Sequence, residues 1–329
     1  MVNSEYIPLT PMNKKVLSWV LFFSLAGIWG SSFILMKRGL ESFSSQQVAA
    51  IRIFVAFVFL VPIAFKHIRK EHLKHWKAFA IMGLFGNLIP AFLFTESETV
   101  ISSALAGMLN SLTPLFTLLL GFLFYGSKPE RKQVLGISFG FIGAIGLVYD
   151  PAGMNDSGNA LWYALMVVAA TLCYGISVNN IKKYLQEVSP VTATVWSMSF
   201  IGPIAGVYLF SSTDFVSRIA TVPHAWTSFG YICILGVVGT SISVILFNIL
   251  IRQTGALFAS SVTYLIPVAA ILWGLADKET VIPSHLLWIS VILGGVYLVN
   301  RKPSALISLQ EEKKPSSLPS PAGEGGQSL

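Results

Sequence analysis

Ten long apolar segments occupy most of this chain. Each is close to the length of about 20 mostly apolar residues that an α-helix needs to cross a bilayer. A β-barrel is excluded, because its spans would be about ten residues of alternating polarity rather than continuous apolar runs. No stretch remains that is large enough for a soluble catalytic domain. The segments are roughly 16–36, 47–65, 77–95, 100–125, 132–149, 160–181, 190–210, 226–250, 255–276 and 284–300.

The composition indicates the same class of protein. Hydrophobic residues make up 54% of the chain and charged residues 11%, whereas a soluble domain carries about 25% charged residues. We therefore predict an all-α polytopic membrane protein. The two cysteines, Cys173 and Cys233, both fall inside apolar segments. They indicate neither a redox compartment nor a metal site.

The basic residues are distributed unevenly between the loops. If both termini are cytoplasmic, most loop lysines and arginines lie on the cytoplasmic side, as the positive-inside rule requires. The other side then holds only Lys37, Arg38, Arg218 and Lys278. This pattern predicts a multi-pass protein of the bacterial inner membrane, and it accounts for the net charge of +7 without nucleic acid. The basic loop 66–77 is expected to face anionic lipid headgroups.

The chain also repeats itself loosely. Residues 29–40 reappear 145 positions later as residues 174–185, and residues 110–114 are echoed 153 positions later by residues 263–267. Five helices in each half would make the second half enter the bilayer from the opposite side. The sequence thus predicts ten transmembrane helices as two inverted-topology five-helix repeats around a central cavity. The expected divisions are a polar lead 1–15, a first repeat 16–149, a linker 150–159, a second repeat 160–302 and a disordered tail 303–329.

Several motifs carry a resemblance to a known family. The run Trp29-Gly30-Ser31-Ser32-Phe33, then Arg52 and the segment 102–116, resembles the EamA-type drug/metabolite transporters, and the segment 259–268 is similar to their second half. The resemblance covers about residues 16–302. It implies two inverted five-helix repeats with a central cavity between helices one, three, four, six, eight and nine. Members of this family export amino acids and other small metabolites.

One departure from the family pattern is visible. The family often carries a Gly-Glu pair after helices four and nine. Here the first half has Gly126-Ser127, and the second half has Lys278-Glu279 without the glycine. A role for the first of those acidic residues is therefore not expected in this chain.

Two matched prolines mark one candidate site. Pro114 and Pro267 lie near the middle of their apolar segments, where proline frees the carbonyl four residues earlier. The freed carbonyls of Asn110 and Thr263 need another partner or must line a wet cavity. These residues, with Tyr264, can bind a zwitterionic substrate or can instead bond neighbouring helices.

A second candidate group lies in the first helix of each half. Trp29 and Ser32, and their counterparts Tyr174 and Ser177, combine an aromatic body with hydroxyl donors. Such a combination suits a cavity wall. The alternative is an aromatic belt at the membrane interface together with small-residue helix packing.

Three charged residues are candidates for gating or coupling. Arg52 lies inside the second apolar segment, and Glu96 and Glu98 lie at the end of the third. An ionisable residue within a span is by default a functional candidate. The alternatives are that Arg52 snorkels to the surface or pairs with Glu41, and that the two glutamates are a solvated pair in a loop.

These observations predict a secondary transporter that exports small polar metabolites, amino acids first, by alternating access. Uptake, or transport of drug-like cations, is the alternative within transport. A non-transporting scaffold or sensor is the alternative outside it, and an intramembrane enzyme is disfavoured because no His or Asp falls in mid-span. The chain has no Walker loop, so ATP is not expected to drive transport. No metal, cofactor or nucleic-acid partner is predicted, and a monomer is expected.

Overall fold

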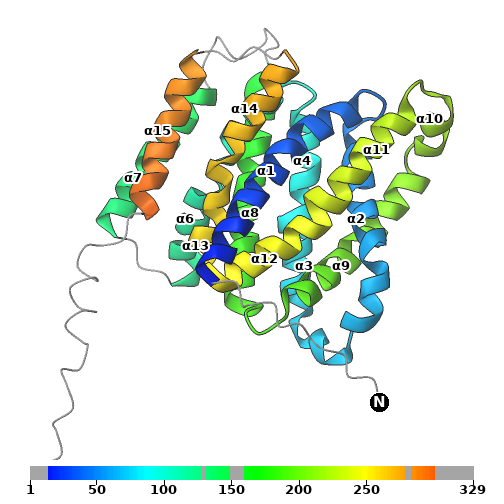
Figure 1. The fold of residues 1–329 in the computed structure, drawn as a ribbon, viewed down its shortest axis with the longest axis horizontal. Helices are drawn as coiled ribbons and strands as arrows, with labels where there is room; N and C mark the ends of the chain where they lie inside the picture. The colour runs from blue at the N-terminus through cyan, green and yellow to red at the C-terminus, as the bar shows by residue number, and fades with distance from the viewer. Residues whose placement is uncertain (1–13, 127–129, 149–158, 279–282, 301–329) are drawn as a thin grey trace, which may run out of the picture.

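The computed structural model describes residues 14–126, 130–148, 159–278 and 283–300. Within these ranges the chain is helical, without strands, and Figure 1 shows the helices running side by side as one bundle. The expected lead 1–15 and linker 150–159 lie almost wholly outside the described residues, and the tail 303–329 lies entirely outside them. The predicted all-α class is therefore confirmed for the described part of the chain.

The first half contains seven α-helices and two shorter segments, of which η1 is a 3-10 helix and η2 a π-helix. In chain order they are α1 Lys14–Leu40, α2 Ser45–His67, η1 Lys70–His75, α3 Trp76–Gly83, η2 Leu84–Leu88, α4 Ile89–Ser97, α5 Ser103–Asn110, α6 Thr113–Tyr125 and α7 Arg131–Val148.

The second half contains eight α-helices, the π-helix η3 and the 3-10 helix η4. They are α8 Ala160–Tyr184, α9 Pro190–Ser211, α10 Phe215–Thr221, α11 Ala225–Gly236, η3 Val237–Ile242, α12 Ser243–Thr254, α13 Ala256–Ser260, η4 Ser261–Tyr264, α14 Ile266–Ala276 and α15 Pro283–Asn300. Each of the ten predicted segments falls on one helix or on a helix that continues through a break.

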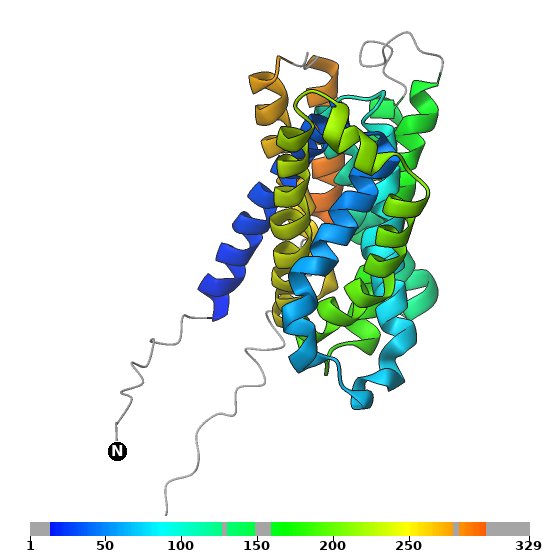
Figure 2. The same cartoon turned by 90° about the vertical axis from the view of Figure 1, so that its right-hand side faces the viewer.

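Eight helical stretches in the described residues are long and apolar enough to cross a membrane. The helices α7 and α15, with 18 residues each, are not among them, so the predicted number of ten spans stays a prediction. The longest helix, α1, has 27 residues and measures about 40 Å at 1.5 Å per residue. A bilayer core is about 30 Å thick, so such a helix either tilts or extends into the headgroup region. Figure 2 shows α1 crossing the bundle obliquely.

Equivalent helices of the two halves begin with the same cap. The Ser44 hydroxyl accepts a hydrogen bond from the backbone N–H of Gln47 at the start of α2, at 3.3 Å. The Ser189 hydroxyl, 145 positions later, accepts from the backbone N–H of Thr192 at the start of α9, at 3.1 Å. Each bond satisfies a backbone donor that the helix itself leaves unpaired.

The π-helical segments also occur at matching positions. The segment η2 begins at Leu84 and η3 begins at Val237, 153 positions later. Each contains a glycine, Gly86 or Gly239. Short π-helical turns inside α-helices are frequent at functional sites, and both of these lie beside the cavity described below.

The helices are interrupted where the matched prolines were expected to break them. Helix α5 ends at Asn110 and α6 starts at Thr113, so that Pro114 lies in the first turn of α6, where a missing N–H costs nothing. Pro267 has the same place in α14. The Asn110 carbonyl accepts a hydrogen bond from the Thr113 hydroxyl at 2.8 Å, so this carbonyl has a partner within the break.

The two halves pack against each other through equivalent crossings. Helix α1 packs on α14, and its counterpart α8 packs on α6. A Cβ added to Gly30 on α1 would lie 2.3 Å from the Cβ of Ala269, and one added to Gly175 on α8 would lie 3.0 Å from the Phe116 carbonyl carbon. Helices α7 and α15 pack together at one edge of the bundle, as Figure 1 shows. Opposite orientation of the two halves remains a prediction.

Candidate functional site

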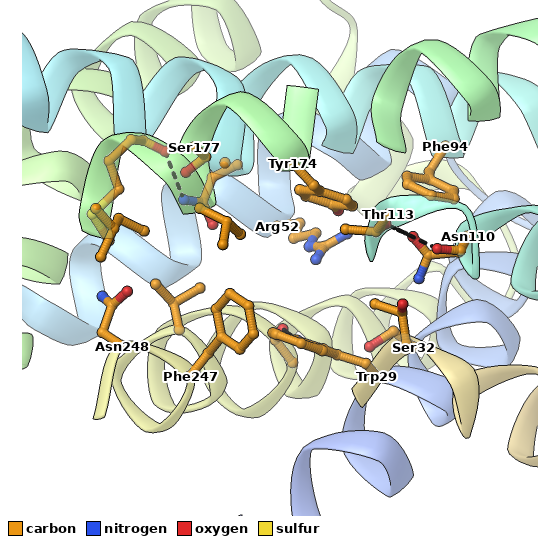
Figure 3. Close-up of a pocket in the computed structure, with 18 of the residues that line it drawn as sticks. Trp29, Ser32, Arg52, Phe94, Asn110, Thr113, Tyr174, Ser177, Phe247 and Asn248 are labelled. Carbon is orange, nitrogen blue, oxygen red and sulfur yellow. Dashed lines mark hydrogen bonds between the residues drawn. The ribbon is translucent and has the colours of Figure 1, made fainter. Parts of the chain in front are cut away.

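A cavity lies in the middle of the bundle and takes its lining from both halves. Its volume, measured as the space open to the centre of a water molecule, is about 90 Å³, which is enough for several waters or a small ligand. Figure 3 shows its polar and aromatic side chains facing one another across the space. The lining residues are Trp29, Ser32, Phe33, Met36, Arg52, Met82, Gly86, Asn87, Phe94, Asn110, Thr113, Tyr174, Ser177, Val178, Ile181, Gly239, Val244, Phe247, Asn248 and Thr263.

Most of this lining consists of positions related by the repeat. At the offset of 145, residues of α1 match residues of α8, and at the offset of 153 the later helices match. The cavity therefore has two similar walls, each of which combines the first helix of one half with later helices of the other half. The matched pairs are Trp29 and Tyr174, Ser32 and Ser177, Phe33 and Val178, Met36 and Ile181, Gly86 and Gly239, Phe94 and Phe247, and Asn110 and Thr263.

The aromatic residues make equivalent contacts on the two sides. Trp29 packs edge to face on Phe247 with ring centroids 5.0 Å apart, and Tyr174 stacks on Phe94 at 6.0 Å. The Trp29 indole N–H donates to the Ser243 hydroxyl at 3.0 Å, which holds the ring at the cavity rather than at a membrane interface. The sequence left open whether Trp29 was a cavity wall or a belt residue, and the structure places it in the wall.

Each π-helical glycine lies against a serine of the other half. A Cβ added to Gly86 would lie 2.5 Å from the Ser177 hydroxyl oxygen, and one added to Gly239 would lie 3.1 Å from that of Ser32. The missing side chains allow α8 and α1 to approach the π-helical segments closely. Both serine hydroxyls consequently lie at the cavity wall.

Arg52 projects from α2 into the cavity, as Figure 3 shows. Its Nε donates to the Thr240 hydroxyl at 2.8 Å, and its Nη1 lies 3.8 Å from the Met36 sulfur. The alternative that Arg52 pairs with Glu41 is wrong, because the Glu41 carboxylate accepts instead from Arg38 at 2.5 Å. Arg52 has no charged counterpart, since the related position is the fully buried Ser197.

A model of the EamA-like transporter family matches residues 17–149 and 161–301 of the chain. The chain belongs to this family. The twofold match covers both predicted halves, and it agrees with the motifs that carried the resemblance.

Curated relatives of this EamA-like transporter span nearly its whole length. An uncharacterized inner membrane transporter YedA of Escherichia coli (strain K12) is 28% identical over 84% of this chain and 88% of its own. An uncharacterized transporter of Archaeoglobus fulgidus is 27% identical over 86% and 99%. A probable amino-acid metabolite efflux pump of Salmonella typhimurium is 23% identical over 82% and 90%. A multi-pass membrane transporter is thereby supported.

A solved crystal structure has the same fold. It superposes with a TM-score of 0.58 at 16% sequence identity and covers 90% of this chain and 99% of that one.

Not all predicted site residues of this EamA-like transporter line the cavity. Seven do: Trp29, Ser32, Arg52, Asn110, Tyr174, Ser177 and Thr263. The lining does not include Pro114, Tyr264 or Pro267, although the two prolines begin the helices that follow Asn110 and Thr263. The prolines therefore lie in the first helical turns after the breaks, next to the cavity residues Asn110 and Thr263.

Neither predicted glutamate is part of the lining. Glu96 accepts hydrogen bonds from the Ser45 hydroxyl at 2.5 Å and from the Gln46 side chain at 3.1 Å, in the first turn of α2. A carboxylate in this place is stabilised by the positive end of the helix dipole. Glu98 is buried at the end of α4 and is close enough to attract the Arg52 guanidinium electrostatically.

Two asparagines of the lining were not predicted. Asn87 and Asn248 lie in apolar runs, and their counterparts in the repeat are Thr240 and Thr95, so the repeat comparison gave no signal. The Asn248 amide N–H donates to the Thr194 hydroxyl at 3.0 Å. Among the described residues its Oδ1 is buried without a hydrogen-bond partner. An intramembrane Asn without an obvious helix partner is the signal that could have identified it.

The helices that line the cavity are joined differently at their two ends. At the end of α1, Lys37 Nζ lies 2.5 Å from an oxygen of Asp277, and Arg38 also pairs with Asp277. The Lys37 ammonium, hydrogen-bonded to the Asp277 carboxylate, holds the pKa of that carboxyl below its usual value of 3.8. At the end of α8, Lys183 lies 5.3 Å from the centre of the Tyr125 ring. No group of three potential metal ligands lies together in the described part of the chain.

Proposed function

We propose that this chain is a secondary transporter that exports small polar metabolites, amino acids first, through its central cavity. The observation that carries the proposal is the cavity lined by repeat-related residues of both halves. A binding site between two related halves is how many secondary transporters expose one site to alternate sides of the membrane.

The chemistry of the lining supports a small, polar substrate. Aromatic faces of Trp29, Tyr174 and Phe247 enclose the space, and Ser32 and Asn110 place hydroxyl and amide groups in it. A site of this kind holds an apolar body and fixes its orientation through a few polar groups. The efflux-pump relative of Salmonella typhimurium supports amino acids as the first substrates to test.

Alternating access would follow from relative rocking of the two halves. The matched crossings of α1 on α14 and of α8 on α6 support this movement, because each joins one half to the other. The orientation with both termini cytoplasmic, and contact of loop 66–77 with anionic headgroups, belong to the same proposal. The proposal also states that the two halves have opposite orientations in the membrane and that the protein is not an enzyme.

Efflux from proteoliposomes tests the function. Purified protein is reconstituted in liposomes loaded with a labelled mixture of neutral amino acids. Release of the label is compared with release from equally loaded liposomes that contain no protein. We expect protein-dependent efflux that Ser32→Leu abolishes, because leucine fills the cavity wall. Ser138→Leu is the matched control: both hydroxyls donate to the carbonyl four residues earlier at 3.1 Å, but Ser138 is exposed on α7.

The same assay separates the alternatives. Release of labelled drug-like cations in place of amino acids would support the cation alternative. Accumulation of external label inside the liposomes, without efflux, would support uptake. Chemical conversion of the label would indicate an enzyme. If no metabolite of the panel moves in either direction, the transport proposal is overturned and the scaffold alternative gains support.

A further inference from the structure

Among the described residues that line the cavity, Arg52 of the first half carries a fixed positive charge, and no other lining residue is charged. We infer that Arg52 recognises an anionic group of the transported molecule, so that the substrate carries a carboxylate or an anion of similar size. This inference rests on the proposed function and names the substrate class of the same cavity.

The contacts of Arg52 fix its guanidinium and leave donors available. Nε is bonded to Thr240 in η3, which belongs to the other half, and Nη1 lies against the Met36 sulfur. A guanidinium carries five N–H donors in a planar fork. The remaining donors on the terminal nitrogens face the cavity that Arg52 lines. A carboxylate can accept two parallel hydrogen bonds from such a fork.

The charge balance of the cavity favours an anionic ligand. A buried cation inside a membrane is costly unless a counter-charge lies near it. The carboxylate of Glu98 attracts Arg52 from the end of α4 but does not line the cavity. The hydrogen bonds of the guanidinium go to Thr240 and Met36, with no carboxylate among the described residues. An anion of the substrate would therefore be the charged group in direct contact with Arg52.

A second group in the cavity points to the other end of a zwitterion. The Oδ1 of Asn248 is an acceptor that is buried and has no hydrogen-bond partner among the described residues. Asn248 lines the same cavity as Arg52 and is only 3% exposed. A buried acceptor of this kind lowers its free energy when a ligand donates to it. An ammonium group supplies such a donor, so Asn248 would accept from the ammonium end of a substrate whose carboxylate lies at Arg52.

Matched ligands test the two roles separately. Dissociation constants are measured on the detergent-purified full chain for leucine, for leucinamide, which lacks the carboxylate, and for 4-methylpentanoate, which lacks the amine. Alanine and phenylalanine are tested with the corresponding analogues. We expect wild type to prefer the amino acid over its amide by about 10- to 100-fold, the range for a hydrogen bond between charged groups.

The variants then assign the preference to residues. Arg52→Gln should remove the preference for the amino acid over the amide, and Arg52→Lys should retain part of it. Asn248→Leu should weaken the preference over 4-methylpentanoate and leave the preference over the amide intact. Arg131→Gln, which removes the same charge from an exposed position at the start of α7, should change neither ratio. A melting curve shows whether each variant is folded.

The outcomes separate this inference from the proposed function. If amino acids are transported but Arg52→Gln keeps the wild-type ratio of amino acid to amide, the inference is overturned and the function stands. If 4-methylpentanoate binds through Arg52 while no amino acid is bound or transported, the inference holds and amino-acid export fails. Absence of binding by every carboxylate in the set overturns the inference.

Discussion

Two helix crossings in this EamA-like transporter have similar close packing at a glycine, but the helix ends beyond them make different contacts. Helix α1 crosses α14 at Gly30, and α8 crosses α6 at Gly175, 145 positions later. Beyond the first crossing, Arg38 pairs with the carboxylate of Asp277. Beyond the second, the equivalent Lys183 lies over the ring of Tyr125.

The two halves have kept the glycines at the crossings and have diverged at the helix ends. Close packing of backbones tolerates only glycine at the crossings, so both halves retain it. The ends of these helices tolerate either an ion pair or a cation–π contact, and there the halves have diverged. Asp277 corresponds to Phe124 in the first half, which cannot form an ion pair. The end of α1 is thus held by an ion pair to Asp277, and the end of α8 by a cation–π contact to Tyr125.

Adding a methyl group at either crossing should have the largest effect. We expect Gly30→Ala and Gly175→Ala each to lower the free energy of unfolding by about 1–3 kcal/mol, because neither site has room for the new atom. Melting of the purified protein measures the effect. Gly27→Ala is the control on the same helix, since its Cβ would meet nothing within 4 Å. Equal damage at position 27 would contradict the packing explanation.

The glycines beside the cavity should show a smaller and unequal effect. Gly86→Ala brings a methyl group to 2.5 Å from the Ser177 hydroxyl oxygen, whereas Gly239→Ala leaves 3.1 Å to Ser32. We expect about 1 kcal/mol of destabilisation at position 86 and less at position 239. Ser177→Ala should rescue Gly86→Ala in a double-mutant cycle. Without rescue, the loss would come from elsewhere than this contact.

The helices and much of the cavity lining could be predicted from the sequence, because the length of apolar segments and the spacing of the repeat can be read from the sequence directly. They identified the helices and the lining residues Trp29, Tyr174 and Asn110. They could not identify Asn248, whose counterpart is Thr95. They also could not decide whether Arg52 snorkels or enters the cavity. That choice depends on Thr240, which is distant in sequence and is brought to Arg52 by the fold.

Removing the contact at the end of α1 and the contact at the end of α8 should have different effects on stability. We expect Asp277→Asn to lower the free energy of unfolding by about 1 kcal/mol at most, since Lys37 and Arg38 are more than a third exposed and their ion pairs are screened. Tyr125→Leu should cost about 0.5 kcal/mol, the range for an exposed cation–π contact. High salt should remove the difference between Asp277→Asn and wild type, and its persistence would contradict an ionic contact.

The smallest effect concerns pH. Because the folded protein holds the pKa of Asp277 below 3.8, this carboxylate stabilises the fold above that pH. The contribution is lost as pH falls through the lowered pKa. We therefore expect wild type and Asp277→Asn to converge in stability below about pH 3.8 and to differ by a constant amount between pH 5 and pH 8. A difference that changes within the latter window would assign the titration to another group.

The central claim is that both ends of one cavity must open in turn for transport. The most direct test is flux through a protein locked at one end. Cys173 and Cys233 are first replaced. One cysteine pair is then introduced, either Lys37→Cys with Asp277→Cys or Lys183→Cys with Tyr125→Cys. A cleavable bifunctional thiol reagent joins the two cysteines in liposomes. Alternating access predicts that either lock stops amino-acid efflux and that cleavage restores it. Efflux that continues through a fully locked protein would contradict alternating access.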